Sequence, residues 1–244
     1  MIGFSTGCLY KNWNPVSKEA IEIIRSTGCD GIELCAGKVE RIDRFDSISE
    51  EDLKGFEYIS LHLPDDIHYL NNSKTEKLLK KIFEIHKRIG FDCVVVHPDL
   101  VDDWEIFEKF DLPLCVENLD ILKKTGKSIK DMESFLSGRK FGMVLDLTHS
   151  YTSDSSMKLA ENLYDNFADR IYEIHLSGYF VQDGDGQTHS SLFITKQEEI
   201  LMSVPLNKPV IIESVLFGYP DEGRAEWAKE QLKKELNYVK KYVK

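Results

Sequence analysis

The stretch FGMVLDLTHSY, residues 141–151, changes within a few positions from apolar to metal-ligating side chains. Residues 143–145 predict a buried strand, and Asp146 follows at its end. His149 comes three residues later, so a carboxylate and an imidazole could converge above a sheet. An Asp in this place is also a common helix cap, and His149 alone could be a solvated loop residue. The metal interpretation gains weight only if other strands end in the same way.

Composition predicts one domain over residues 1–244, because a chain of this length with 42% hydrophobic residues can bury one sizeable core. The formal charge of −11 disfavours a general attraction to nucleic acid or to an anionic membrane and leaves room for a local basic patch or a metal-mediated phosphate site. No apolar run approaches the roughly 20 residues of a membrane span, and the start of the chain carries no basic leader. We therefore expect a cytoplasmic protein that contacts no membrane.

The five cysteines lack CxxC spacing and predict reduced thiols. Nothing in the composition predicts the oligomeric state.

Apolar strand segments alternate with helical segments along the whole chain. The strands are predicted at 2–5, 31–34, 58–61, 93–96, 112–116, 143–145, 171–174 and 209–212. Helices are predicted at 18–27, 49–54, 74–89, 103–110, 128–136, 154–167, 196–202 and 224–242. Residues 177–189 are expected to form a long Gly-rich loop, and residues 38–44 a polar, partly basic connection. Eight strands alternating with helices predict an α/β fold, a single (β/α)8 TIM barrel.

Six of these strands end in a side chain that can bind a metal. The six residues are His62, His97, Glu117, Asp146, His175 and Glu213. The carboxyl ends of the strands of such a barrel face one shared pocket, so residues distant in sequence should meet there. We therefore expect one site at the barrel mouth.

At these residues the chain resembles the xylose isomerase-like barrel superfamily, which includes sugar isomerases and epimerases, hydroxypyruvate and inosose enzymes, and the endonuclease IV branch. The segments that carry the resemblance are GIELCAG at 31–37, SLHLP at 60–64, VVVHPD at 94–99, CVENLD at 115–120, LDLTH at 145–149, EIHLSG at 173–178 and IIES at 211–214. The resemblance implies a metal centre whose shared ligands are Glu117, Asp146, His175 and Glu213. It also implies further metal ligands or substrate contacts at His62, His97, His149 and His189.

The chemistry of these residue types agrees with that implication. Three carboxylates and one imidazole suit a divalent ion such as Mn²⁺, Mg²⁺ or Zn²⁺, and additional imidazoles shift the preference toward Zn²⁺, Mn²⁺ or Fe²⁺. A carboxylate directly after an apolar strand is costly without a cation. An ion pair or a rim charge is the alternative for Glu117 and Glu213. The number of ions stays open.

Residues of the neighbouring loops are candidate contacts for a small-molecule substrate. Tyr10 and Trp13 lie in the first strand–helix loop and Phe217 in the last, where aromatic faces could cover the apolar side of a sugar. Packing within the loops is the alternative. Glu33, at the end of the second strand segment, is a further candidate.

Two kinds of enzyme fit this pattern. In an isomerase or epimerase, a metal would polarise a small sugar, polyol or keto acid while Glu117 and Glu213 remove and return a proton through an enediolate. In an endonuclease IV-like enzyme, two or three ions bridged by Glu117 would cleave a phosphodiester of abasic DNA. A barrel that binds a metal or sugar without catalysis is a third alternative.

Departures from both family branches bear on this choice. The endonuclease pattern has an Asp two residues before the histidine aligned with His189, where this chain has Gln187; Asp183 or Asp185 could substitute. The epimerase branch has an Arg where this chain has Val181. The chain is acidic and has no long basic insertion, so the isomerase or epimerase reading is preferred.

Overall fold

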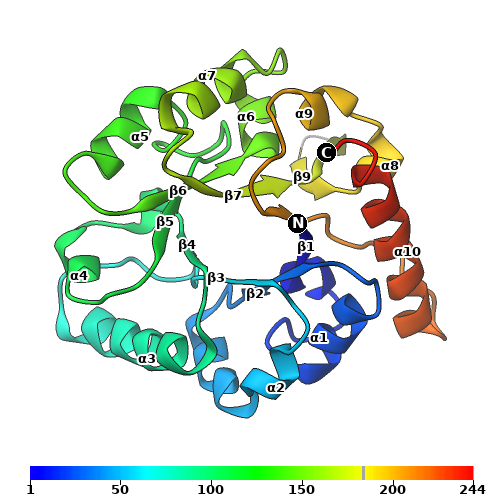
Figure 1. The fold of residues 1–244 in the computed structure, drawn as a ribbon, viewed down its shortest axis with the longest axis horizontal. Helices are drawn as coiled ribbons and strands as arrows, with labels where there is room; N and C mark the ends of the chain where they lie inside the picture. The colour runs from blue at the N-terminus through cyan, green and yellow to red at the C-terminus, as the bar shows by residue number, and fades with distance from the viewer. Residues whose placement is uncertain (183–184, 244) are drawn as a thin grey trace.

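The computed structural model describes residues 1–182 and 185–243. Eight parallel strands close into a barrel in the order β1-β10-β7-β6-β5-β4-β3-β2, which confirms the predicted (β/α)8 fold (Figure 1). The barrel strands are β1 (Ile2–Ser5), β2 (Gly31–Cys35), β3 (Tyr58–His62), β4 (Cys93–Val96), β5 (Leu114–Glu117), β6 (Gly142–Asp146), β7 (Ile171–Leu176) and β10 (Val210–Ile212). The barrel closes where β1 pairs with β10.

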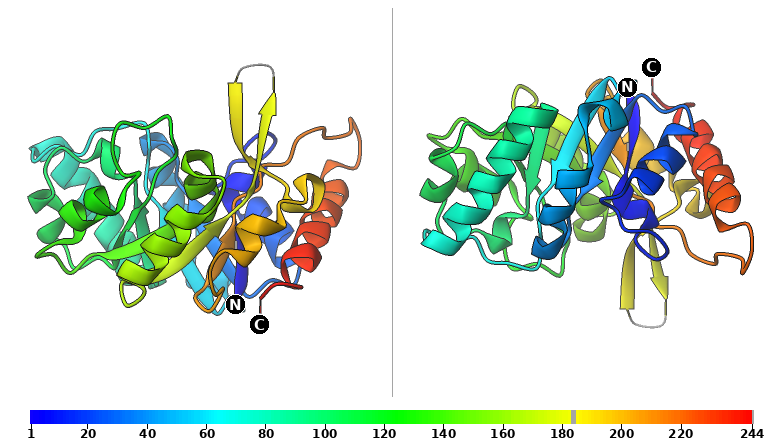
Figure 2. Two further views of the ribbon diagram at one scale, coloured as in Figure 1. Left: turned by 90° about the horizontal axis from the view of Figure 1, so that it is seen from above. Right: turned by 90° about the horizontal axis from the view of Figure 1, so that it is seen from below.

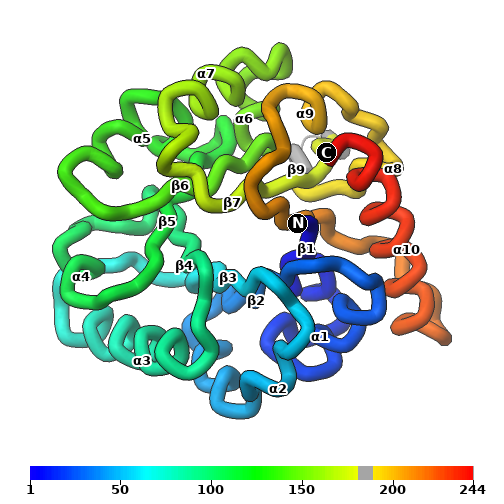
Figure 3. The backbone as a smooth tube through the Cα atoms, viewed as in Figure 1, coloured from blue at the N-terminus to red at the C-terminus, as the bar shows by residue number. Residues whose placement is uncertain are grey.

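Helices surround the barrel as an outer ring (Figure 1). They are α1 (Lys18–Arg25), α2 (Glu50–Leu53), α3 (Ser73–Ile89), α4 (Glu105–Glu108), α5 (Ile129–Leu136), α6 (Leu147–Ser153), α7 (Lys158–Phe167), α8 (Leu192–Thr195), α9 (Glu198–Met202) and α10 (Arg224–Val239). Short 3-10 helices are η1 (Thr6–Leu9), η2 (Val39–Ser47) and η3 (Pro98–Leu100). The backbone trace shows the last helix, α10, on the outside of the barrel between α1 and α8 (Figure 3). The longest helix, α3, begins where the Asn72 side chain accepts hydrogen bonds from two backbone N–H groups, and it ends at Gly90 with φ of 77°. No helix in the described residues is long and apolar enough to span a membrane.

Apolar side chains lie on both faces of the barrel strands. In β4, Val94 and Val96 belong to the large core between strands and helices. Cys93 and Val95, the alternating positions, belong to a smaller cluster inside the barrel. All four residues are fully buried. The barrel strands therefore carry apolar side chains on both faces, and the polar side chains of the interior lie at the mouth and just below it.

The structure differs from the sequence predictions in three connections. Residues 147–153 form the helix α6 directly after β6. Residues 39–47 form η2 instead of an open connection. The expected Gly-rich loop contains an antiparallel hairpin of β8 (Gly178–Gln182) and β9 (Asp185–Ser190). Figure 2 shows the hairpin projecting from the end of the barrel opposite the two chain termini. The hairpin therefore stands beside the mouth.

Candidate metal centre

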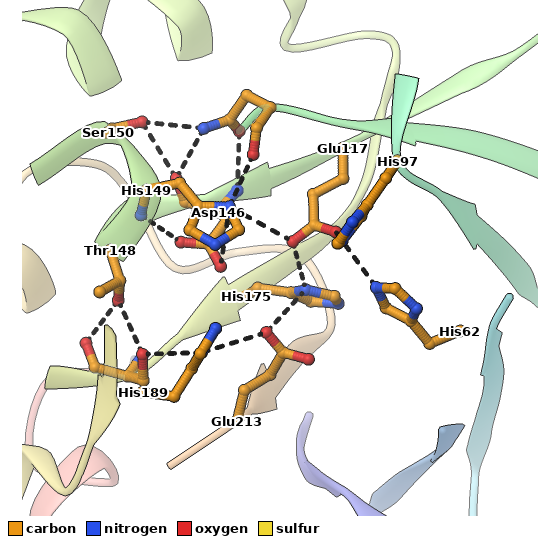
Figure 4. A network of polar contacts seen from close by, with 12 residues as sticks. His62, His97, Glu117, Asp146, Thr148, His149, Ser150, His175, His189 and Glu213 are labelled. Atoms are coloured by element: carbon orange, nitrogen blue, oxygen red, sulfur yellow. Dashed lines mark hydrogen bonds and ion pairs between the residues drawn. The ribbon is translucent and has the colours of Figure 1, made fainter. Parts of the chain in front are cut away.

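The parallel register places the strand-end side chains together at the barrel mouth. Asp146 at the end of β6 pairs with His175 of β7, and His62 ends β3. Figure 4 shows side chains from these strands, together with Glu117 and Glu213, pointing toward one another. The six strand ends predicted from the sequence thus meet in one site.

Four of these side chains form the first potential ligand group. Glu117, Asp146, His175 and Glu213 offer atoms that all lie within 4.8 Å of one another. His175 Nδ1 lies 3.0 Å from Glu117 Oε1 and 3.3 Å from Glu213 Oε2. Three carboxylates and one imidazole in this space form a donor set for a divalent cation.

A second potential ligand group shares Glu117 with the first. Glu117 Oε2 lies 3.3 Å from His62 Nε2 and 3.0 Å from His97 Nε2. The other oxygen, Oε1, faces His175. Because its two oxygens face different groups, Glu117 is placed as a bridging carboxylate would be in a two-metal site.

Asp146 shows how well the mouth fits a cation. Its Oδ1 accepts the backbone N–H of His149 at 2.6 Å and so caps α6. Its Oδ2 is buried and has no hydrogen-bond partner in the described part of the chain. Burial raises the pKa of this carboxyl to about 7, although His149 opposes the shift. An ionised, buried oxygen without a donor is costly, and a cation bound beside it would remove that cost.

Hydrogen bonds fix which nitrogen of three histidines faces the centre. The Nδ1 of His62 donates to the carbonyl of Leu63 at 3.0 Å, and that of His149 donates to the carbonyl of Asn118 at 2.8 Å. A carbonyl only accepts, so Nε2 of both rings is left for the site. His175 is held the other way, with Nε2 2.6 Å from Glu173 Oε1 and Nδ1 toward the centre.

His149 and His189 lie beside the two potential ligand groups and belong to neither. His149 lies on α6 and is 4% exposed, so the solvated-loop interpretation was wrong. Its Nδ1 lies 3.7 Å from Asp146 Oδ2. His189 lies in β9 of the hairpin with φ of 66°, and its Nδ1 lies 3.8 Å from Glu213 Oε2. The two rings are 5.6 Å apart. The question of Asp183, Asp185 and Gln187 falls outside the residues and side chains that the structure describes.

Glu213 and Glu117 are ionised, and His62 beside them is cationic. Burial raises the pKa of Glu213, but the charge of His175 outweighs this and lowers it to about 2. The pKa of Glu117 also lies well below its usual range, because His175, His62 and His97 outweigh its burial. Burial lowers the pKa of His62, but Glu117 and its neighbouring carboxylates raise it to about 10. Without metal, protons on the histidines therefore balance the negative charge of the carboxylates, as a metal cation would.

Two further carboxylates lie deeper in the barrel, behind His175. Glu33 was expected near the substrate, but it is fully buried, its Oε2 lies 3.4 Å from His175 Nε2, and it is absent from the described lining of the cavity. Residue 33 of β2 points inward one layer below the mouth. Sequence reasoning missed Glu173, the acceptor for His175. The alternation of β7 could have revealed it, since residues two apart on a strand share a face.

The centre opens into a cavity of about 370 Å³. Tyr10 lines it, as predicted, together with Lys38, Arg41 and Lys123. Trp13 instead donates Nε1–H to Glu19 at 2.7 Å and packs on Tyr219. Phe217 lines an adjacent groove. Cys35 and Asp120 also line the cavity, and neither they nor Lys123 had been singled out from the sequence.

Comparisons with known proteins agree with this fold. No protein-family model matches the chain, and no curated protein matches it in sequence. Among solved structures, a D-tagatose 3-epimerase-like protein is 18% identical, with 98% of both chains covered and a TM-score of 0.64. Endonuclease IV from Thermus thermophilus is 16% identical over 97% of this chain and 99% of its own, with a TM-score of 0.64. A 3-keto-D-glucoside 4-epimerase from E. coli is 14% identical, with 98% of both chains covered and a TM-score of 0.61. The chain therefore shares the barrel fold of these three proteins.

Proposed function

We propose that the protein is a divalent-metal-dependent isomerase or epimerase that moves a proton on a small sugar, polyol or keto acid. The observation that carries the proposal is the convergence of Glu117, Asp146, His175 and Glu213 beside the cavity. A cavity of about 370 Å³ has the size of a small-molecule site. Similarity of fold to two sugar epimerases supports the same class.

The two catalytic carboxylates have different surroundings. Glu213 is 14% exposed and lines the cavity, and its lowered pKa keeps it ionised, so it is the better placed base. Glu117 approaches His175 from the other side, and both of its oxygens contact histidines (Figure 4). We assign proton removal to Glu213, which would release this proton to water in the cavity. Glu117 would return a proton that it first takes from the cationic His62, whose Nε2 lies 3.3 Å from Glu117 Oε2, and His62 would regain its proton from solvent. A divalent ion held here would stabilise the negative charge of an enediolate. The chain's own residues orient the substrate and carry the proton.

A second candidate is metal-dependent hydrolysis of a phosphodiester. The group of His62, His97 and Glu117 favours it, because a second ion there would share Glu117 with the first. Similarity of fold to endonuclease IV is in line with it. The formal charge of −11 and the small cavity favour the first candidate over a DNA substrate.

A panel of ketoses, keto acids and polyols in deuterated water with Mn²⁺ tests the proposal. We expect solvent deuterium in the product, because a proton taken up by a carboxylate can exchange before its return. Glu213→Gln and Glu117→Gln should each abolish the incorporation, while the surface variant Glu226→Gln should retain it. Metal-dependent cleavage of an abasic-site duplex without any turnover of the panel would replace this proposal by the second candidate.

A further inference from the structure

A second hollow lies beside the metal cavity, between the β8–β9 hairpin, α8 and the segment that leads to α10. It has a volume of about 320 Å³. Its lining is mainly apolar and aromatic: Phe180, Phe193, Ile194, Leu216, Phe217 and Trp227. Ser190, Thr195 and Gln231 add a few polar groups. We call this hollow the apolar groove.

Several large apolar side chains in the lining of the groove are exposed to solvent. Phe180 is 52% exposed, Ile194 68% and Phe217 45%, and they come from three different elements. Single exposed apolar residues are ordinary, whereas several that gather around one hollow indicate a binding surface. A concave, aromatic lining with a few polar groups is typical of a small-molecule site.

The groove adjoins the metal cavity, and the two hollows share a wall. Val215 lines both, and its N–H donates to the carbonyl of His189 at 2.7 Å. His189 lines the cavity and its neighbour Ser190 lines the groove. On the outer side, Lys11 Nζ lies 4.7 Å from the ring centre of Tyr10, in the cavity, and 5.7 Å from that of Phe217, in the groove. A ligand that passes over this shared, exposed edge beside Tyr10 and Phe217 would span both hollows.

We propose that the apolar groove binds an apolar or aromatic substituent of the substrate, whose polar part lies at the metal centre. The inference rests on the proposed function and narrows the substrate class to a sugar, polyol or keto acid joined to such a substituent. A hollow of about 320 Å³ suits a ring or a short alkyl chain. A stable protein partner would instead need roughly 800 Å² of this surface. The groove thus sets specificity, while Glu213 and Glu117 act on the polar end.

Two metal-chelating probes of different length test the groove. Acetohydroxamate reaches only the metal, and 4-phenylbutyrohydroxamate adds a phenyl tail. Their affinities are measured by calorimetry with Mn²⁺-loaded protein. We expect the tail to tighten binding at least about tenfold, as burial of a phenyl group in an apolar groove predicts. Ile194→Ser and Phe217→Ser should each reduce this ratio severalfold. The control Leu122→Ser, at a residue that is 80% exposed and outside the described groove lining, should leave the ratio unchanged.

The outcomes separate the groove from the proposed function. A ratio near one, or a gain that survives both groove substitutions, overturns the inference. If the protein takes up no Mn²⁺ in the same calorimeter, the metal proposal is the one that fails. Saturation-transfer NMR with 4-phenylbutyramide and metal-free protein then decides the groove: a transfer signal that disappears in Ile194→Ser supports it, and a wild-type protein that gives no signal overturns it. Self-association in sedimentation that both groove variants abolish would assign the surface to a second copy of the chain and also overturn the inference.

Discussion

The barrel mouth and the junction of α10 with α8 both bury carboxylates, but the chain satisfies them differently. At the junction, Glu235 is fully buried and accepts hydrogen bonds from Leu192 N at 2.7 Å, Phe193 N at 3.0 Å and Ser214 Oγ at 2.7 Å. At the mouth, Asp146 Oδ2 has no donor among the described residues. Burial alone therefore does not indicate a metal. The indication comes from carboxylate oxygens that converge with imidazoles and lack donors of their own.

The largest expected effect is the stabilisation of the fold by a bound divalent ion, which should depend on the mouth and not on the junction. A divalent ion at about 100 times its dissociation constant should stabilise the fold by about 2.7 kcal/mol, or roughly 5–10 °C in Tm for a chain of this size. Glu213→Gln removes a ligand charge with little change of shape and should lose most of this rise with Mn²⁺ or Zn²⁺. Glu235→Gln should keep the rise. Thermal melts with metal and with a chelator measure both, and a full rise in Glu213→Gln would place the ion elsewhere.

A smaller effect is expected from the layer beneath the mouth. Glu173 Oε1 accepts from His175 Nε2 and so keeps Nδ1 toward the centre. Glu173→Gln can still fill the space but loses the charge that makes the imidazole a better ligand. Mn²⁺ affinity should fall about 10- to 100-fold, as for other residues that support a metal ligand. Competition with a chelating dye measures the affinity.

The control for Glu173→Gln is its stability without metal. A positioning role changes the affinity for metal and a purely structural role does not. An unchanged Mn²⁺ affinity together with a lowered Tm of the metal-free protein would show that Glu173 serves only packing. Glu226→Gln, at a surface ion pair with Lys229, should change neither quantity.

At the junction, substitution should lower the stability of the metal-free protein and leave the stabilisation by metal unchanged. Glu235→Gln places an amide NH₂ where an acceptor faces three donors, so at least one hydrogen bond is lost inside the protein. The free energy of unfolding should fall by about 1–3 kcal/mol. Urea denaturation of the metal-free protein measures the loss. A variant as stable as the wild type would mean that the junction tolerates rearrangement and that the contrast with the mouth is weaker than proposed.

The smallest expected effect is the pH dependence of the stabilisation by metal. Without metal, the folded-state pKa of His62 is raised to about 10 from an ordinary 6.5, so its contribution to stability is complete below pH 6.5 and is lost as pH rises through 10. The pKa of Asp146 is raised from 3.8 to about 7, so the metal-free fold also loses stability as pH rises from about 4 to 7.

Metal binding needs the deprotonated groups and strengthens with pH. The rise in Tm with Mn²⁺ should therefore be larger at pH 8 than at pH 6. An equal rise at both values would contradict protonation of the empty site, and His62→Gln should flatten the difference.

The sequence predicted the barrel and the six mouth residues because both depend on local patterns. An apolar run of four or five residues predicts a buried strand, and a polar residue directly after it must lie at the strand end. His62, His97 and Glu213 were placed in this way without any knowledge of their neighbours. Parallel register then brings the strand ends together.

Features that depend on the partner of a side chain were not predictable in this way. Asp146 was weighed as a ligand or a cap, and it caps α6 with one oxygen while the other faces the site. Glu33 was a candidate substrate contact, but it lies within β2, which ends at Cys35, and its side chain is fully buried one layer below the mouth. The β8–β9 hairpin was missed because its Gly-rich sequence lacks the alternating apolar pattern of a strand pair that covers a core.

Anomalous diffraction from a crystal grown with Mn²⁺ tests the central claim most directly. We predict a strong peak between the side chains of Glu117, Asp146, His175 and Glu213, at about 2 Å from the ligand oxygens and nitrogen. A second peak beside His62 and His97 would add support to the hydrolytic candidate. Metal bound by the crystal with no peak among the four residues would contradict the account.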